Sequence, residues 1–153
     1  MKLIIACDPD GGIGYENRLP WTNIQGDLPR FKRLTEGQTV IMGRNTWDSL
    51  PKKPLPGRVN IVVSSRPLEA EHHNVIRSPE LNFNRPDDVA FWLIGGAKLV
   101  EAYKREIDEI HLTRVYDHYT CDTHIDLLYI EANYSRTYCE VFSDHTYEVW
   151  KRK

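Results

Sequence analysis

Four short apolar runs, each bounded by turn-prone residues, divide the first hundred residues of the chain. They are KLIIAC (2–7), TVIMG (39–43), VNIVVSS (59–65) and VAFWLIGG (89–96). Continuous runs of this length and composition predict strands buried on both faces of a sheet. Between or after them, apolar residues recur at helical spacing, which predicts helices over DLPRFKRLTEG (27–37), RNTWDSL (44–50) and GAKLVEAYKREI (96–107).

The last third of the chain follows a different pattern, in which apolar and polar residues alternate. EIHLTRVY (109–116) predicts one strand, and residues 134–153 predict an antiparallel hairpin that turns at Ser143-Asp144. Residues 78–88 (SPELNFNRPDD) are assigned no regular structure. Alternating strands and helices followed by a hairpin predict one α/β domain over residues 1–153, with a mostly parallel sheet and an antiparallel edge.

A carboxylate interrupts the apolar stripe of the first predicted helix. Asp27 stands four residues before Phe31 and seven before Leu34, so all three share one helix face. Two interpretations are open at this point. Asp27 either caps the helix, with Pro29 in its first turn, or points into an apolar cleft as a functional group.

Composition narrows the class of protein. The 153 residues carry 20 basic and 22 acidic side chains, a formal charge of -2, and show no basic stripe interleaved with aromatics, so we expect no nucleic-acid partner. The run LIIAC is too short for a signal peptide, and no apolar stretch approaches ~20 residues, so we expect no membrane segment. Three cysteines without a CxxC pair favour reduced thiols and a cytoplasmic protein.

Polar residues follow three of the predicted buried strands. The segments are Arg44-Asn45-Thr46, Ser64-Ser65-Arg66 and Gly95-Gly96-Ala97-Lys98. Ligands of open α/β sheets bind beyond the carboxyl ends of the strands, and free N–H groups, hydroxyls and cations suit phosphate. Each segment alone is equally consistent with a helix cap, a turn or tight packing, but together they favour a phosphate-bearing ligand. A GxGxxG fingerprint is absent, so a dinucleotide would be held differently from the usual pattern.

The glycine-rich segment DPDGGIGYEN (8–17) lacks the lysine of a phosphate-binding P-loop. It is either a plain turn or a mobile loop over a pocket, with Leu19 and Trp21 as its apolar cover.

Five stretches, in this order and spacing, resemble the short single-domain form of dihydrofolate reductase. They are GIGYENRLPW, DLPRFKRLT, VIMGRNTWDSLPKKPLPGR, LIGGAKLV and DTHID, and the resemblance spans nearly the whole chain. It implies a central, mostly parallel sheet with helices on both faces and a C-terminal antiparallel hairpin. It also implies reduction of 7,8-dihydrofolate to tetrahydrofolate with NADPH, by hydride transfer to C6 and protonation of N5. A monomer is the family expectation.

The resemblance assigns the substrate half of the site. Asp27 matches the carboxylate that binds the pterin and promotes protonation of N5, and Thr113 matches the threonine that hydrogen-bonds it. Arg58 matches the arginine that pairs with the glutamate carboxylate of folate. Leu19 and Trp21 match the loop that closes over the nicotinamide. The apolar wall around the substrate corresponds to Ile4, Ala6, Leu28, Phe31, Leu50 and Leu55.

The resemblance also assigns the NADPH half. Arg44 with Ser64, Ser65 or Arg66 would bind the 2′-phosphate and favour NADPH over NADH. The remaining cofactor positions are Ala6, Ile13, Gly43, Asn45, Thr46, Gly95, Gly96, Ala97, Lys98, Leu99 and Thr123.

Some positions depart from the family pattern. Val100 and Ile125 stand where aromatic residues are common, which puts the catalytic rate in question rather than the reaction. Two alternatives remain: a reductase of another pterin-like or pyrimidine substrate, and a non-catalytic folate- or NADPH-binding protein on the same fold. His124 and the pair His72-His73 suggest a metal, but the family uses none, so we expect no metal site.

Overall fold

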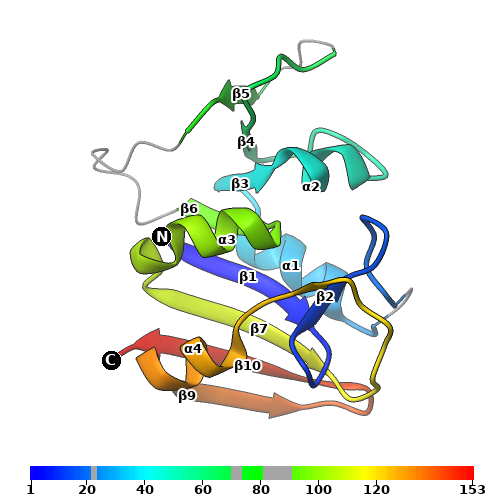
Figure 1. The fold of residues 1–153 in the computed structure, drawn as a ribbon, viewed down its shortest axis with the longest axis vertical. Helices are drawn as coiled ribbons and strands as arrows, with labels where there is room; N and C mark the ends of the chain where they lie inside the picture. The colour runs from blue at the N-terminus through cyan, green and yellow to red at the C-terminus, as the bar shows by residue number, and fades with distance from the viewer. Residues whose placement is uncertain (22–23, 70–73, 81–90) are drawn as a thin grey trace.

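The computed structural model describes residues 1–21, 24–69, 74–80 and 91–153 (Figure 1). In chain order the strands are β1 (Lys2–Cys7), β2 (Gly12–Gly14), β3 (Thr39–Gly43), β4 (Val59–Val63), β5 (Val75–Ser78), β6 (Phe91–Gly95), β7 (Glu109–Val115), β8 (Thr123–His124), β9 (Tyr134–Val141) and β10 (His145–Arg152). The helices are α1 (Asp27–Thr35), α2 (Arg44–Ser49), α3 (Ala97–Tyr103), the 3-10 turn η2 (Lys104–Glu106) and α4 (Leu127–Asn133).

Eight strands form one sheet in the order β5-β4-β3-β6-β1-β7-β10-β9. The pairs from β5 to β7 are parallel, and β10 is antiparallel to both β7 and β9. The mostly parallel sheet with a C-terminal antiparallel hairpin is therefore confirmed. Residues 142–144 make the turn of this hairpin, as the Ser143-Asp144 pair predicted.

Both faces of the sheet are covered, because successive residues of each buried strand point to opposite sides. On one face Ile41 and Leu93 lie in a core cluster with residues of α3 and α4. On the other, Val40 and Met42 lie in a cluster with Trp47 of α2 and Leu34 of α1. This double burial is why these strands appear in the sequence as continuous apolar runs rather than alternating ones.

The predicted helices form close to the expected positions. α1 begins at Asp27 and ends at Thr35, and Gly37, with φ 75°, lets the chain turn toward β3. α3 covers the first part of its predicted range and continues as the single turn η2. None of the helices in the described ranges is long and apolar enough to span a membrane.

Four elements were absent from the sequence-based prediction: β2, β5, β8 and α4. β2 and β8 are very short and pair with each other across more than a hundred residues. β5 is an exposed edge strand without a buried apolar run. The segment 78–88, for which no regular structure was expected, lies outside the described residues from position 81 onward, and β5 ends at its first residue, Ser78.

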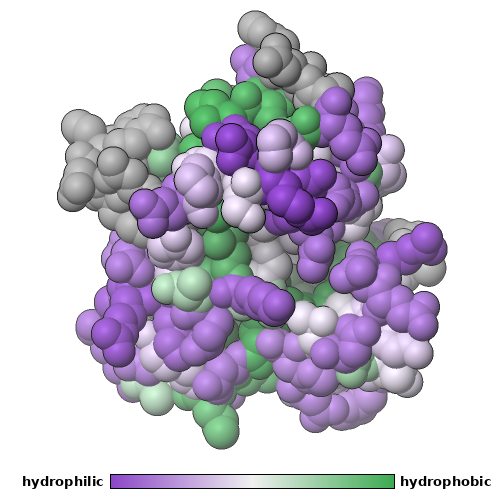
Figure 2. Space-filling view, turned by 45° about the horizontal axis from the view of Figure 1, so that its top comes forward, coloured by the Kyte–Doolittle hydropathy of each residue, from purple (hydrophilic) through white to green (hydrophobic). Residues whose placement is uncertain are grey.

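The carboxyl ends of the parallel strands lie along one edge of the sheet, where the ribbon shows the loops after β1 and β7 together (Figure 1). α1 begins and the hairpin turns at this same edge. In the space-filling view, hydrophobic residues line the bottom of a furrow across the middle of the molecule (Figure 2). Polar residues dominate the surface on either side of the furrow.

Candidate active site

Asp27 does not cap α1. The N-cap residue is Gly26, with φ 83°, and its helix end has no side-chain cap. The Asp27 carboxylate instead accepts a hydrogen bond from Thr113, with 2.7 Å between Oγ1 and Oδ1, and its side chain is 22% exposed. Its other oxygen, Oδ2, accepts no hydrogen bond from any described residue, so it remains available to a ligand. The structure thus contradicts the interpretation of Asp27 as a helix cap.

Thr113 is the residue of β7 that contacts the Asp27 carboxylate. Its side chain is 5% exposed and its register partner on the neighbouring strand β1 is Ala6. The structure therefore brings together Asp27, Thr113 and Ala6, three positions that lie far apart in the sequence. Arg30 also reaches the site, with Nη2 3.2 Å from Thr113 Oγ1 and 3.4 Å from Asp27 Oδ1. The sequence analysis had not singled out Arg30.

The residues predicted to form the apolar wall differ in exposure. Ile4, Leu50 and Leu55 are partly buried and pack against the core cluster that contains Trp47. Phe31 is partly buried, whereas Leu28 is 73% exposed and leaves a large apolar side chain open to solvent. An exposed leucine one residue from the carboxylate gives a ligand an apolar surface to cover.

Arg58 is buried although it is charged. It is 6% exposed, donates from Nε to the carbonyl of Pro56 at 2.9 Å and from Nη1 to Thr35 Oγ1 at 3.1 Å. Burial lowers the pKa of Arg58, and the negative charge of Glu36 offsets this in part. No carboxylate lies within ion-pair distance of Arg58 among the described residues. A buried guanidinium held by neutral oxygens is suited to an external carboxylate.

Two glycine turns meet at the ends of β3 and β6. A Cβ added to Gly43 would lie 3.7 Å from the backbone nitrogen of Gly96, and one added to Gly95 would lie 3.2 Å from Thr46 Oγ1. The peptide bond between Gly95 and Gly96 is cis. The first turns of α2 and α3 therefore lie side by side, with little room for side chains between them.

The arginine and serines after β3 and β4 also converge. Arg44 donates from Nη1 to the carbonyls of Arg66 and Pro67 at 3.4 and 3.1 Å, and its Nε pairs with Asp48 at 3.2 Å. Ser64 Oγ accepts from the backbone N–H of Arg66 at 3.2 Å. These contacts place the predicted phosphate-binding segments next to one another. Ser65, Arg66 and Asn45 are exposed.

The segment after β1 is tied to the loop after β7. The backbone N–H of Glu16 donates to Asp122 Oδ2 at 2.9 Å, and β2 pairs with β8 so that Gly14 opposes Thr123. Trp21 is buried against Tyr119, with ring centroids 5.5 Å apart, while Leu19 is 56% exposed. Ile13, on β2, is partly buried against the core.

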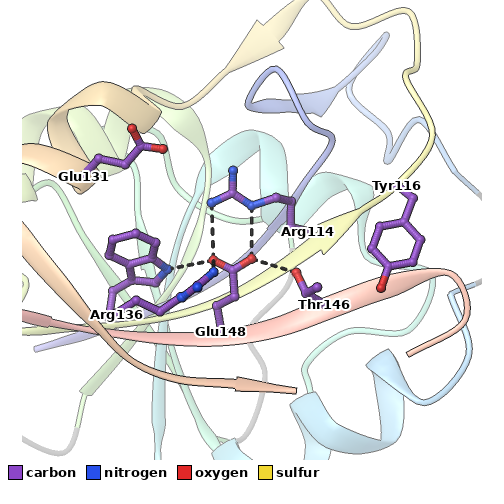
Figure 3. Close-up of a pocket in the computed structure, with 7 residues that line it drawn as sticks. Arg114, Tyr116, Glu131, Arg136, Thr146 and Glu148 are labelled. Atoms are coloured by element: carbon purple, nitrogen blue, oxygen red, sulfur yellow. Dashed lines mark hydrogen bonds and ion pairs between the residues drawn. The ribbon is translucent and has the colours of Figure 1, made fainter. Parts of the chain in front are cut away.

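The described surface has at least two cavities. One of about 430 Å³ is lined by Ala97, Lys98, Val100, Glu101, His124, Ile125 and Asp126, beside the glycine turn of α3. The other, of about 730 Å³, lies over the hairpin (Figure 3), and Asp27 is not among the residues that line it. There Glu148 pairs with Arg114 at 3.1 Å and accepts from Thr146 at 2.7 Å and Trp150 at 3.0 Å. These bonds serve the packing of β7 on β10.

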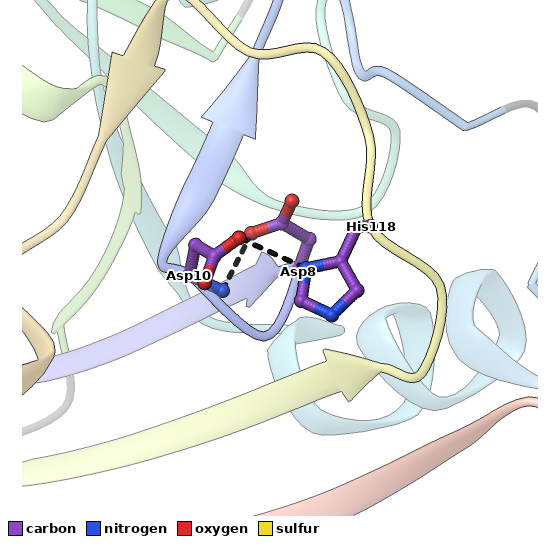
Figure 4. A group of neighbouring side chains, drawn as sticks. All are labelled: Asp8, Asp10 and His118. Atoms are coloured by element: carbon purple, nitrogen blue, oxygen red, sulfur yellow. Dashed lines mark hydrogen bonds and ion pairs between the residues drawn. The ribbon is translucent and has the colours of Figure 1, made fainter.

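One cluster has the ligand types of a metal site: Asp8, Asp10 and His118 (Figure 4). Asp8 already accepts backbone N–H groups from Asp10, Gly12 and Tyr119 at 2.8–3.1 Å. Burial would raise the pKa of Asp8, but these hydrogen bonds lower it below its usual value. The carboxylate thus holds the loop after β1. His124 lines the smaller cavity, and the other two histidines considered, His72 and His73, lie outside the described residues.

Comparison with known proteins agrees with this geometry. The model of the dihydrofolate reductase family matches residues 1–148. A dihydrofolate reductase type 8 of Escherichia coli is 38% identical over 166 aligned positions, covering 100% of this chain and 96% of the relative. A dihydrofolate reductase of Staphylococcus aureus is 35% identical over 124 positions, covering 80% and 76%.

A longer relative matches as well. The bifunctional dihydrofolate reductase-thymidylate synthase of Paramecium tetraurelia is 38% identical over 129 positions, which cover 82% of this chain but 28% of that protein.

The doubly covered sheet places the chain in the α/β class, and the family match identifies it as an oxidoreductase. More particularly, the chain belongs to the dihydrofolate reductase family. 

Proposed function

We propose that this protein reduces 7,8-dihydrofolate to 5,6,7,8-tetrahydrofolate with NADPH, and so supplies one-carbon metabolism. The observation that carries the proposal is Asp27, whose Oδ1 is held by Thr113 while Oδ2 faces no donor among the described residues. Family membership over residues 1–148 supports the same reaction.

The substrate fits the two ends of the site. The edge of a pterin presents a ring N–H beside an exocyclic amino group, a pair of donors that both oxygens of one carboxylate can accept. Asp27 would bind this edge, with Ile4, Ala6, Leu28, Phe31, Leu50 and Leu55 as the apolar wall. Arg58 would bind a carboxylate of the glutamate tail of folate, and the ion pair would compensate for the burial of the guanidinium charge.

The residues present also fit a nicotinamide dinucleotide. Side-chain-free backbone at Gly43, Gly95 and Gly96 lets a pyrophosphate approach closely, beside Thr46. The cavity lined by Ala97 and Lys98 adjoins this turn. The remaining cofactor contacts would come from Ala6, Ile13, Asn45, Leu99 and Thr123.

Selectivity for NADPH rests on the convergence of Arg44 with the segment 64–66. The guanidinium of Arg44 and the hydroxyl of Ser64 both donate to the Arg66 carbonyl. Ser65 would add a second hydroxyl and Arg66 a second cation. Two cations and two hydroxyls suit the extra 2′-phosphate, which NADH lacks.

NADPH, when bound, would supply a hydride for C6 of the pterin, so that the C6–N5 double bond would become single and N5 would take a proton from water. Asp27 orients the pterin, and its negative charge favours protonation at N5 without touching that atom. Thr113 keeps the carboxylate in place. Leu19 and Trp21 belong to the segment that would exclude water from the reacting atoms.

We further propose that the chain acts as a single domain and a monomer, in a reducing compartment such as the cytoplasm. All three cysteines are free thiols, which supports this location.

The test is steady-state reduction of dihydrofolate by NADPH with wild type, Asp27→Asn and, as a control, the exposed Asp117→Asn. Asp27→Asn should fold normally and lose roughly 100-fold or more in rate at neutral pH, with partial recovery as pH falls and substrate arrives protonated. Asp117→Asn should match wild type. If Asp27→Asn equals wild type at every pH, the role given to Asp27 is wrong.

A further inference from the structure

Arg30 is a buried cation beside the candidate catalytic carboxylate. It lies one helical turn after Asp27 on α1 and is 7% exposed. Its Nη2 is 3.2 Å from Thr113 Oγ1, 3.0 Å from His145 Nε2 and 3.4 Å from Asp27 Oδ1. Since Nη2 carries two hydrogens, the two shorter contacts are its hydrogen bonds, and the contact with Asp27 is an ion pair.

The aromatic side chains of the hairpin hold the guanidinium in this position. Its central carbon lies 4.4 Å from the ring centroid of Tyr147 and 5.4 Å from that of Phe142. Stacking on two rings restricts the swing of a long side chain, and a cation over an aromatic face is itself favourable. Arg30 is therefore fixed in place from several sides.

His145 has a defined tautomer, because an arginine only donates. Its Nε2 must accept from Arg30, so Nδ1 carries the hydrogen and donates to Asp144 Oδ1 at 2.6 Å. The imidazole is fully buried and stacks on Phe142 with centroids 4.6 Å apart. A doubly protonated His145 would place a donor against a donor, so the contact with Arg30 requires the neutral ring.

Asp144 extends the chain of contacts to the segment that leads into α1. Its Oδ2 accepts the backbone N–H of Gln25 at 3.1 Å. The hydrogen bond from His145, and then that from Gln25, lower the pKa of Asp144 below its usual value. Asp144 thus stays negatively charged. Hydrogen bonds then run in sequence from Asp144 to His145, to Arg30, to Thr113 and finally to Asp27.

We propose that Arg30 is a positioning residue for reduction, held by His145 and Asp144, which fixes the Oδ1 side of Asp27 through Thr113 and turns Oδ2 toward the substrate. The inference rests on the proposed function. Arg30 acts through Asp27 and Thr113 and does not itself touch the substrate.

The charge of Arg30 also acts on any proton-binding group nearby. From α1, Asp27 and the exposed Arg33 face this region. From the sheet, His111 of β7 and Tyr147 of β10 face this region, with 2.5 Å between His111 Nδ1 and the Tyr147 hydroxyl oxygen. Burial raises the pKa of Tyr147, while Arg30 lowers it in part, so the phenol stays neutral at working pH. Of these charges, Arg30 is the cation in contact with Asp27.

The experiment compares Arg30→Met, Arg30→Lys and the control Arg33→Met in dihydrofolate reduction across pH. Loss of the Arg30 contacts should raise the KM for dihydrofolate about tenfold. Removing a positive charge makes nearby groups hold protons to higher pH, so the midpoint of the kcat/KM profile should rise by about one pH unit. Arg30→Lys should restore this midpoint but not KM, because an ammonium keeps the charge without the planar fork.

The control variant distinguishes the effect of a positive charge in contact with Asp27 from the effect of a positive charge elsewhere on α1. Arg33→Met removes the same residue type from α1 at an exposed position. It should keep the wild-type KM and a pH profile close to that of wild type, because water screens the exposed charge of Arg33 from the site. If Arg30→Met also keeps both, with wild type active, the inference is wrong.

Should Arg30→Met fail to fold, Asp144→Ala decides the question. It removes the partner of His145 and of Gln25 from a partly exposed turn while leaving Arg30 in place. We expect KM to rise about threefold in a protein that still folds, although thermal unfolding moves to a lower temperature because the buried His145 loses its acceptor. An unchanged KM would overturn the inference. A wild type inactive on dihydrofolate would instead overturn the proposed function, so the two failures are distinguishable.

Discussion

The hydrogen bond between Thr113 and Asp27 is the contact whose removal has the most predictable effect. Thr113→Val keeps the shape of a side chain that is 5% exposed and deletes the hydroxyl 2.7 Å from Asp27 Oδ1. The hydroxyl also accepts from Arg30 at 3.2 Å, so the substitution leaves a buried donor without this acceptor. The loss of these two hydrogen bonds should affect both the candidate site and the packing of α1 against β7.

The magnitude follows from the charge on one partner. A hydrogen bond to a charged group contributes about 1.5–3 kcal/mol, of which we take about 2 as the middle. Since about 1.4 kcal/mol corresponds to a factor of ten, kcat/KM for dihydrofolate should fall about 30-fold. The free energy of unfolding should also fall by about 2 kcal/mol, because the same hydrogen bond to a charged group is lost from a buried position.

The assay is steady-state reduction of dihydrofolate, together with chemical unfolding of the same samples. The matched control is Thr137→Val on the exposed strand β9, whose hydroxyl donates to the carbonyl of Val149 at 3.3 Å and lies away from the site. The control should leave kcat/KM unchanged. A drop of less than about threefold in Thr113→Val would refute the claim that Thr113 holds Asp27 in its working orientation.

Three further outcomes are expected. Arg58→Lys should raise the KM for dihydrofolate about tenfold and leave kcat nearly unchanged, because an ammonium replaces the planar fork; equal KM values would contradict the role of Arg58. Burial raises the pKa of Cys7 to about 12, so a thiol reagent near pH 8 should modify exposed Cys139 in the native protein and Cys7 only after unfolding. Burial would raise the pKa of Glu148, but hydrogen bonds from Thr146, Arg114 and Trp150 hold it below its usual value. The contribution of Glu148 to the free energy of unfolding is thus complete above about pH 4.3 and is lost as pH falls further. Glu148→Gln should lower the free energy of unfolding by about 3 kcal/mol at neutral pH, and the stability of this variant should depend less on pH in the acid range.

The sequence predicted the elements whose burial is periodic or continuous. β3 and β6 are buried on both faces and appear as apolar runs, and the helical stripe of Phe31 and Leu34 located α1 with Asp27 at its start. The alternation of the C-terminal segment and its Ser143-Asp144 turn located the hairpin. In each case the local pattern and the tertiary environment agree.

The missed elements depend on distant partners. β2 and β8 exist because each pairs with the other, and neither segment alone has a strand pattern. α4 is a short helix that passes directly into β9 at Tyr134, and its segment was assigned no element in the prediction. Its cap was a usable signal, since Asp126 accepts the N–H of Tyr129 at 3.0 Å.

The site was predicted unevenly for the same reason. Asp27 was singled out because a carboxylate on an apolar helix stripe is unusual. Arg30 gave no such signal, because an arginine three residues after an aspartate is usually a surface ion pair. Its burial depends on His145 and Tyr147, more than a hundred residues away. Position on the stripe shared with Asp27 was the one hint in the sequence.

The most direct test of the central claim is the loss of NADPH absorbance when the purified protein meets dihydrofolate, with NADH run in parallel. The account predicts rapid turnover that is selective for NADPH and greatly reduced by Asp27→Asn. Tight binding of dihydrofolate and NADPH without turnover would contradict it, and would show instead a protein that retains both binding halves without catalysis.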